Sequence, residues 1–304
     1  MSAITFSTPA SQEVHISGTR RSLRHVFSSA SVRIAVLIIC ILWSIPTFGL
    51  LVTSFRDPIA INETGWWTAL TPPYDEFTFK NYENVLNADG MAVSFGNSLL
   101  VTIPSVVIPI TIAAFAAYAF AWLQFPGRDF LFALVVVLLA VPLHTALIPL
   151  LRLYSADNIK LTGTFLGVWL AHTGFGLPLA VYLLYGYIST IPKEIMESAL
   201  IDGASPFTAF TRLVLPLSVP AMASFAIFQF LWVWNDLLVA LVFLGTRDDI
   251  AVMTRTLQEL VGSKGQNWEI LTAGAFVTMV VPLTIFLFLQ RYFVRGLMAG
   301  SVKG

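Results

Sequence analysis

Charged residues are few in this chain, and one short segment between apolar runs holds several of them. The 304 residues are 57% hydrophobic and 11% charged, whereas a soluble domain carries about a quarter charged residues. Glu194, Glu197, Asp202 and Arg212 nevertheless lie close together between two long apolar runs. One further carboxylate, Asp236, lies inside an apolar run. These two places are the candidates for function.

The sequence argues against an enzyme. It contains no G-x-x-x-x-G-K-[ST], H-E-x-x-H or G-x-S-x-G motif, which are the arrangements that hold phosphates, zinc or a serine nucleophile. The histidines are His15, His25, His144 and His172, without metal-ligand spacing. We expect His144 and His172 to hydrogen-bond to neighbouring helices. The chain is therefore predicted to hold no metal or cofactor and to bind no nucleic acid, and any energy from ATP must come through another chain.

Six apolar runs must position the polar residues. Each run is roughly 19 to 27 residues long, enough to cross about 30 Å of hydrocarbon as a helix, and only the fifth holds a charged residue. The sequence therefore predicts an all-α membrane protein with six transmembrane helices. The predicted spans are Ile34–Val52, Ser98–Leu123, Phe130–Leu151, Gly163–Ile188, Ser218–Leu244 and Ile270–Gln290.

The first run is predicted to be a membrane anchor. Three arginines precede it, as in a signal peptide, but about 30 polar residues come first and no A-x-A cleavage site follows. A modest excess of Lys and Arg places both termini and residues 189–217 in the cytoplasm. We expect a polar cytoplasmic tail over residues 1–30 and one membrane domain over residues 31–304. The protein is then a multi-pass protein of the cell membrane.

Every predicted span contains proline. Membrane helices tolerate proline when neighbours or water satisfy the carbonyls that it frees. Two interpretations stay open: ordinary kinks, or a bundle built to bend as a transporter must.

The charged segment is predicted to form two short helices. Pro192 suits the first turn of a helix, and Gly203 ends that helix because glycine adopts positive φ. The apolar face of the first helix is predicted to hold Ile195, Met196, Ala199 and Leu200. Ser205 and Pro206 start the second helix. Its apolar side is predicted to hold Phe207, Phe210, Leu213 and Val214, before Leu215 and Pro216 lead into span five. Either a linker on the membrane surface or a docking element fits this pattern.

The same segment resembles the cytoplasmic signature of ABC importer permeases, E-A-A-x-x-x-G followed by nine residues and I-x-L-P. This chain reads Glu197-Ser198-Ala199, then Gly203, then Leu213-Val214-Leu215-Pro216. Ser198 and Leu213 depart mildly from that pattern. Trp234-Asn235-Asp236 and the stretch 290–296 are similar to the carbohydrate, maltose-type branch of the family. The resemblance covers about residues 30 to 304.

The resemblance implies a permease subunit of an ATP-driven sugar importer, with a coupling helix between spans four and five. Residues 192–216 would dock on an ATPase dimer that binds ATP and Mg²⁺. The implied coupling residues are Glu197, Ala199, Asp202, Gly203, Leu213, Leu215 and Pro216. The other implied partners are a second, related permease and an extracytoplasmic sugar-binding protein. The implied substrate is a di- or oligosaccharide, for instance an α-glucoside.

A different class of function is an autonomous ion-coupled transporter or channel. Such proteins favour several ionisable groups within the membrane, and these spans hold one carboxylate. Asp236 itself allows two interpretations, a structural bond between helices or a polar lining of the sugar route. For the lining we expect Asn97, Trp234 and Asn235 to join Asp236.

Overall fold

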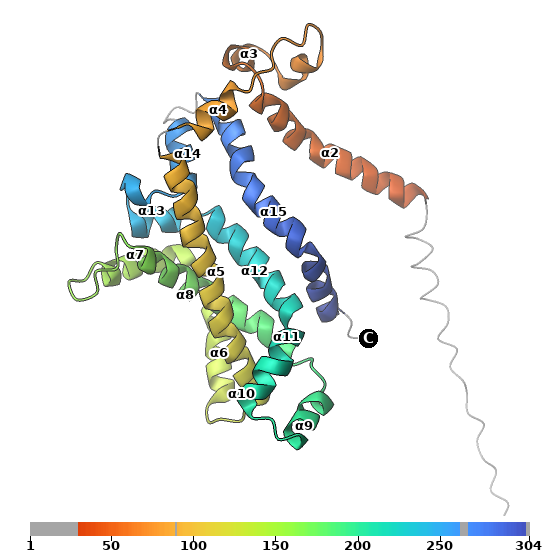
Figure 1. The fold of residues 1–304 in the computed structure, drawn as a ribbon, viewed down its shortest axis with the longest axis vertical. Coiled ribbons are helices and arrows are strands. Elements are labelled where there is room, and N and C mark those ends of the chain that lie inside the picture. Colours follow the sequence, from red (N-terminus) through yellow and green to blue (C-terminus); the bar gives the residue numbers. More distant parts are fainter. Residues whose placement is uncertain (1–29, 89, 262–266, 302–304) are drawn as a thin grey trace, which may run out of the picture. The chain divides into compact units, whose positions relative to one another are not determined.

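Helices joined by short connections make up the described chain (Figure 1). The computed structural model describes residues 30–88, 90–261 and 267–301, so the predicted tail over residues 1–30 lies almost wholly outside them. The longer helices are α2 (Ala30–Ser54), α5 (Met91–Trp122), α6 (Arg128–Leu138), α7 (Leu143–Tyr154), α8 (Phe165–Ile188), α12 (Val219–Trp234) and α15 (Trp268–Ser301). The shorter ones are α3 (Pro58–Glu63), η1 (Trp66–Leu70), α4 (Lys80–Leu86), α9 (Lys193–Ile201), α10 (Pro206–Ala209), η2 (Phe210–Val214), α11 (Leu215–Leu217), α13 (Leu238–Leu244), η3 (Asp248–Ile250) and α14 (Met253–Val261).

Four helices are long and apolar enough to cross a membrane as single spans, namely α2, α5, α8 and α15. They correspond to the first, second, fourth and sixth predicted spans. The all-helical membrane class is therefore confirmed. The count reaches six if each of two bent helix pairs is one span.

Two of the predicted spans, Phe130–Leu151 and Ser218–Leu244, are not single straight helices. In the first, α6 and α7 meet at 103°, with Pro142 immediately before α7. Proline has no N–H, so it removes a helical hydrogen bond and favours a break at this point. In the second, residues 235–237 separate α12 from α13, and the 67° bend between the segment Pro206–Leu217 and α12 lies at its beginning. The chain thus bends where the hydropathy is uniform.

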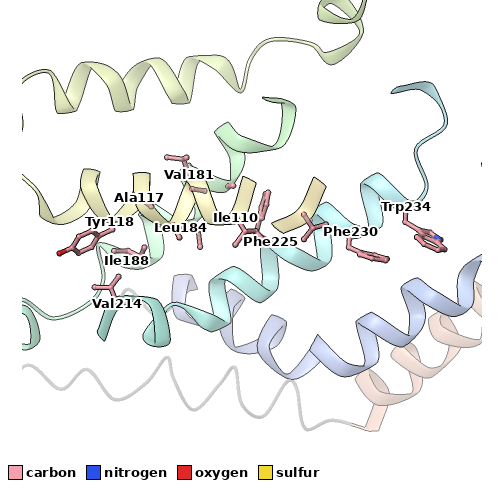
Figure 2. Close-up of a cluster of buried hydrophobic side chains, with 14 of the residues drawn as sticks. Ile110, Ala117, Tyr118, Val181, Leu184, Ile188, Val214, Phe225, Phe230 and Trp234 are labelled. Carbon is pink, nitrogen blue, oxygen red and sulfur yellow. The ribbon is translucent and has the colours of Figure 1, made fainter. Parts of the chain in front are cut away.

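The core of residues 53–304 lies where α5 packs along α8 and α12, and α12 packs along α15. Figure 2 shows side chains from α5, α8 and α12 in one apolar cluster. Ala113, Ala117 and Ala180 are fully buried in it. Small side chains let helix backbones approach closely, and larger side chains of the same cluster, Leu184 and Phe225 among them, are also fully buried.

Residues 54–88 form a compact polar cap at one end. Arg56 is 1% exposed and pairs with Glu76 at 2.6 Å. Its guanidinium also donates to the carbonyls of Ala60 at 3.0 Å and Thr64 at 3.2 Å. Asn81 at the start of α4 donates to the Arg56 carbonyl at 2.8 Å. The cap is therefore folded around a buried arginine.

Residues 245–256 are bonded to the beginning of α5. Asn97 donates to the carbonyls of Asp249 at 3.0 Å and Ala251 at 2.9 Å. The Ser98 hydroxyl accepts from the Met253 amide at 2.8 Å. At its other end, 20 or more residues along the helix, α5 contacts the 193–217 segment. One helix thus connects two very different polar regions.

Candidate functional site

The segment 193–217, here called the insert, contains a sharply defined turn. Helix α9 ends with Gly203 at φ +76°. The Gly203 amide donates to the Leu200 carbonyl at 3.0 Å, and the Ala204 amide donates to the Ala199 carbonyl at 2.9 Å. These two bonds form the Schellman arrangement that satisfies the last carbonyls of a helix. The predicted helix end at Gly203 is confirmed.

The second half of the insert begins as the sequence indicates. The Ser205 hydroxyl accepts from the Thr208 amide at 3.2 Å, and Pro206 occupies the first turn of α10. Residues 210–214 then continue as a π-helix. This rarer geometry, in which each amide bonds five residues back, was not indicated by the apolar pattern.

Contacts with α5 hold the second half in place. The Tyr118 hydroxyl donates to the Pro206 carbonyl at 2.9 Å. The ring of Phe210 lies against Phe115 and Tyr118, with centroids 4.7 and 5.2 Å apart. Movement of this half is therefore coupled to the end of a long membrane helix.

The predicted apolar faces are only partly correct. Met196 and Ala199 are buried, whereas Leu200 is 59% exposed and Phe207 is 66% exposed. Ile195 is 38% exposed. Helix α9 contacts the rest of the chain through a narrower stripe than its apolar pattern indicates, because short α9 packs chiefly on α10. Several apolar side chains of the insert are left at its surface.

The predicted coupling residues fall into three groups. Glu197, Asp202 and Gly203 are exposed. Ala199 is buried. Leu213 and Leu215 are half-buried, and Pro216 is exposed. Asp202 and Gly203 thus lie at the end of α9 and Glu197 within it, and the later three lie on the connection to α12.

Asp236 lies in the break between α12 and α13. Its carboxylate accepts from the Ala240 amide at 3.1 Å, which satisfies one of the first amides of α13. Its backbone carbonyl accepts from the Thr254 hydroxyl at 3.0 Å. The side chain is 10% exposed. The side-chain bond of Asp236 is therefore a local cap on α13, and both interpretations of Asp236 stay open.

A small polar cavity adjoins this carboxylate. Ser98 and Thr102 of α5 and His172 of α8 line it together with Asp236. His172 Nε2 lies 3.9 Å from Asp236 Oδ2, and neither ring nitrogen of His172 has a hydrogen-bond partner among the described residues. The expected hydrogen bond from His172 to a neighbouring helix is therefore absent there. A carboxylate, an imidazole and two hydroxyls can bind a water molecule or a hydroxyl group.

One other predicted pathway residue, Trp234, lines the same cavity. Trp234 is 3% exposed and stacks on Phe230 at 5.6 Å between ring centroids. Asn97 is bonded to the 245–256 loop. Asn235 is exposed and donates back to the Leu231 carbonyl at 2.7 Å. The structure therefore brings Trp234 and Asp236 to one small cavity, and Asn97 and Asn235 do not line it.

Sequence reasoning missed Ser98, Thr102 and Gln229, all buried polar residues in apolar helices. The signal was available in principle, because a polar side chain within a membrane helix requires a partner. Single hydroxyls and one amide do not stand out in hydropathy.

Comparison with known proteins places these features in a family. Residues 90–298 match the family described as "binding-protein-dependent transport system inner membrane component". The osmoprotective compounds uptake permease protein GgtD of Synechocystis is 57% identical over 274 residues, which cover 90% of this chain and 91% of that protein. The alpha-glucoside transport system permease protein AglG of Rhizobium meliloti is 62% identical over 242 residues, 79% of this chain and 63% of that protein.

The fold is similar to that of solved transporters. A chain of a bacterial ABC transporter involved in the import of the acidic polysaccharide alginate superimposes with a TM-score of 0.66. It is 20% identical in sequence, and the match covers 87% of this chain and 98% of that chain. The chain therefore belongs to the family of binding-protein-dependent transport system inner membrane components.

Proposed function

We propose that this chain is one of two permease subunits of an ATP-driven importer for α-glucosides, in the form of di- or oligosaccharides. The observation that carries the substrate class is the 62% identity with an alpha-glucoside transport permease. The importer would also contain a second related permease, an ATPase dimer that binds ATP and Mg²⁺, and an extracytoplasmic sugar-binding protein. It lies in the cell membrane with both termini in the cytoplasm. Family membership favours this function over an autonomous ion-coupled transporter.

A second substrate class has its own support. The relative with the greater coverage carries out uptake of osmoprotective compounds, and it is 57% identical over 274 residues. An osmoprotective compound is therefore the second candidate substrate of this chain.

Uptake by a deletion strain distinguishes the two classes. The strain is complemented with this chain and its partner genes, and uptake of labelled maltose, trehalose and sucrose is compared with that of the β-linked cellobiose. We expect uptake of at least one α-linked sugar and none of cellobiose. Restored growth at high salt without α-glucoside uptake would favour the second class, and restoration of neither would contradict both.

Residues 192–216, which make up nearly all of the insert, are proposed to couple this chain to the ATPase. Support comes from its surface: Glu197 and Asp202 are exposed, and the adjacent Ile201 is 86% exposed. A surface that combines unpaired charge and apolar side chains is typical of a protein interface. The Tyr118 bond to Pro206 would carry displacement of the insert to α5.

Two variants test the coupling assignment. Asparagine tolerates positive φ, so Gly203→Asn keeps the turn while adding a side chain where a partner would approach. Glu197→Lys reverses an exposed charge. Both should lower retention of the ATPase on the purified permease pair. Glu83→Lys, an exposed reversal on α4 at the other end, is the matched control. Full retention in both insert variants would refute the assignment.

We propose that Asp236 lines the sugar route, because it lines a cavity together with Ser98, Thr102 and His172. Asp236→Asn keeps a side-chain oxygen that can accept from Ala240. We expect the assembled complex to form and its uptake to fall. Unchanged uptake and sugar preference would leave Asp236 with a structural role only.

A further inference from the structure

Three side chains of the bundle donate to carbonyls that prolines have freed. In an α-helix each carbonyl accepts from the amide four residues later, and proline has no amide hydrogen. The carbonyl four residues before a helical proline therefore lacks its usual bond. Bulk water does not reach the hydrocarbon, so a neighbouring helix is one of the few sources of a donor for that carbonyl.

Helix α5 shows this twice. Pro104 frees the carbonyl of Leu100, and Trp169 Nε1 of α8 donates to that oxygen at 2.9 Å. Pro109 frees the carbonyl of Ser105, and Gln229 Nε2 of α12 donates to it at 3.1 Å. Both bonds join residues far apart in the chain.

Helix α15 repeats the arrangement. Pro282 lies within α15 and frees the carbonyl of Thr278. Trp234 Nε1, from the last residue of α12, donates to that oxygen at 3.1 Å. Each donor is thus on a different helix from its proline, and the three bonds link α5, α8, α12 and α15.

The surroundings of Gln229 are shaped for its bond. The side chain is 3% exposed and lies across α8, where its amide is also 3.4 Å from the His172 carbonyl. Gly176 leaves the necessary room, since a Cβ there would lie 2.6 Å from Gln229 Oε1. A methyl group at position 176 would therefore displace the amide.

We propose that Trp169, Gln229 and Trp234 are positioning residues of the transport bundle, each matched to one proline. The three pairs, here called proline latches, are Trp169 with Pro104, Gln229 with Pro109, and Trp234 with Pro282. Each latch fixes a proline kink to a neighbouring helix, so the four helices keep their mutual positions while the insert transmits movement. The transport part of this inference rests on the proposed function, whereas the pairing itself does not.

A matrix of double variants tests the pairing in the purified complex with its partner subunits. Trp169→Phe, Gln229→Met and Trp234→Phe remove the donors and keep most of the volume. Pro104→Ala, Pro109→Ala and Pro282→Ala restore the helical amide, so the carbonyl no longer needs a donor. Pro178→Ala in α8 is the unmatched control. Thermal unfolding midpoints are measured for each donor variant with and without each repair.

Each donor variant should lower the midpoint by roughly 2–4 °C, the shift that accompanies one ordinary lost interaction in a domain of this size. Only the matched proline repair should remove that loss. If Trp169, Gln229 and Trp234 contribute by packing alone, matched and unmatched repairs will have equal effects, and the proposal is wrong. Substrate uptake should follow the same pattern. If the matched repairs restore the thermal midpoints but the complex takes up no sugar, the pairing is supported and the proposed function is contradicted.

Gly176→Ala keeps the test decisive if a repaired variant does not assemble. It should lower the midpoint as Gln229→Met does, and the two changes together should lower it no further. Additive losses would show that the Gln229 amide is not the group displaced, which would overturn the second latch.

Discussion

The two ends of α5 use charge in opposite ways. At its beginning, charged side chains form hydrogen bonds and ion pairs with other residues of the same chain. Arg255 is 7% exposed and donates to Asp248 at 2.8 Å and Glu259 at 2.8 Å. A hydrogen bond from Arg247 lowers the pKa of the Asp249 carboxyl. Together with the Arg56 cap, these pairs make an internally bonded region.

At the other end the charges have no such partners. The charged side chains of the insert are exposed, and in the described parts of the chain none of them forms an ion pair; they are Lys193, Glu194, Glu197, Asp202 and Arg212. The insert is held by its turn, by the hydroxyls of Tyr118 and Tyr187, which donate to the carbonyls of Pro206 and Leu217, and by a small aromatic cluster.

This difference separates a region that maintains its own shape from one that presents a surface. Buried pairs lose much when one partner is removed, whereas exposed charges contribute little to stability. Substitutions at the two ends should therefore differ in kind. Those in the cap should unfold it, and those in the insert should leave the fold intact while changing what binds.

The largest effect is expected for Arg56→Met. The change removes the Arg56 donor from Glu76 and from the Thr64 carbonyl, and breaking a buried pair costs about 3–5 kcal/mol. Hydrogen exchange of amides in residues 57–82 should become fast. Arg247→Met is the matched control, because Arg247 is 64% exposed in its pair with Asp249. Equal exchange in the two variants would show that the cap does not depend on its buried arginine.

The next effect is expected for Gly203→Val. An L-residue at φ +76° costs roughly 1–2 kcal/mol, and a β-branched residue is among the least tolerated there. No atom lies within 4 Å of the added Cβ, so the loss comes from backbone strain and not from a clash. Exchange at the Gly203 and Ala204 amides should rise. Gly203→Asn should keep both amides protected, and similar rates in the two variants would argue against strain.

The turn at Gly203 and the restart at Ser205 could be predicted because they depend on short-range rules. A helix end and a cap are decided by residues within about four positions of each other. The all-helical membrane class could also be predicted, because it depends only on continuous apolar stretches of about 20 residues. The exposed Leu200 and Phe207 could not be predicted, since a short helix buries only what its neighbours cover.

The role of Trp234 needed a contact that sequence does not contain. Its partner Thr278 is 44 positions away, and Trp169 and Leu100 are 69 positions apart. Apolar periodicity could place an indole in the membrane, but it could not tell a sugar-facing ring from one that donates to a kinked helix. The bend between α6 and α7 could not be predicted from the sequence either. Pro142 is one of many prolines in the spans, and most of them do not break the helix.

Asp236→Ala should have a smaller effect than the turn variant. It removes the acceptor for the Ala240 amide, and loss of such a helix cap costs about 1 kcal/mol. Asp236→Asn should retain most of that stability because asparagine is as good a cap as aspartate. Thermal midpoints of the assembled complex measure both. Equal losses for the two variants would show that charge, and not the cap, is what the break at residues 235–237 requires.

The smallest effect on stability is expected for Glu197→Gln, and it sharpens the comparison most. The carboxylate is exposed and forms no ion pair among the described residues, so the unfolding free energy should change by no more than about 0.5 kcal/mol. The same change removes a charge from the surface proposed to meet the ATPase, so sugar-stimulated ATP hydrolysis should fall while the midpoint stays constant. Glu76→Gln in the cap should do the reverse, because Glu76 bonds the buried Arg56. A drop in midpoint for Glu197→Gln would mean that the insert, like the cap, uses its charges to hold its own fold.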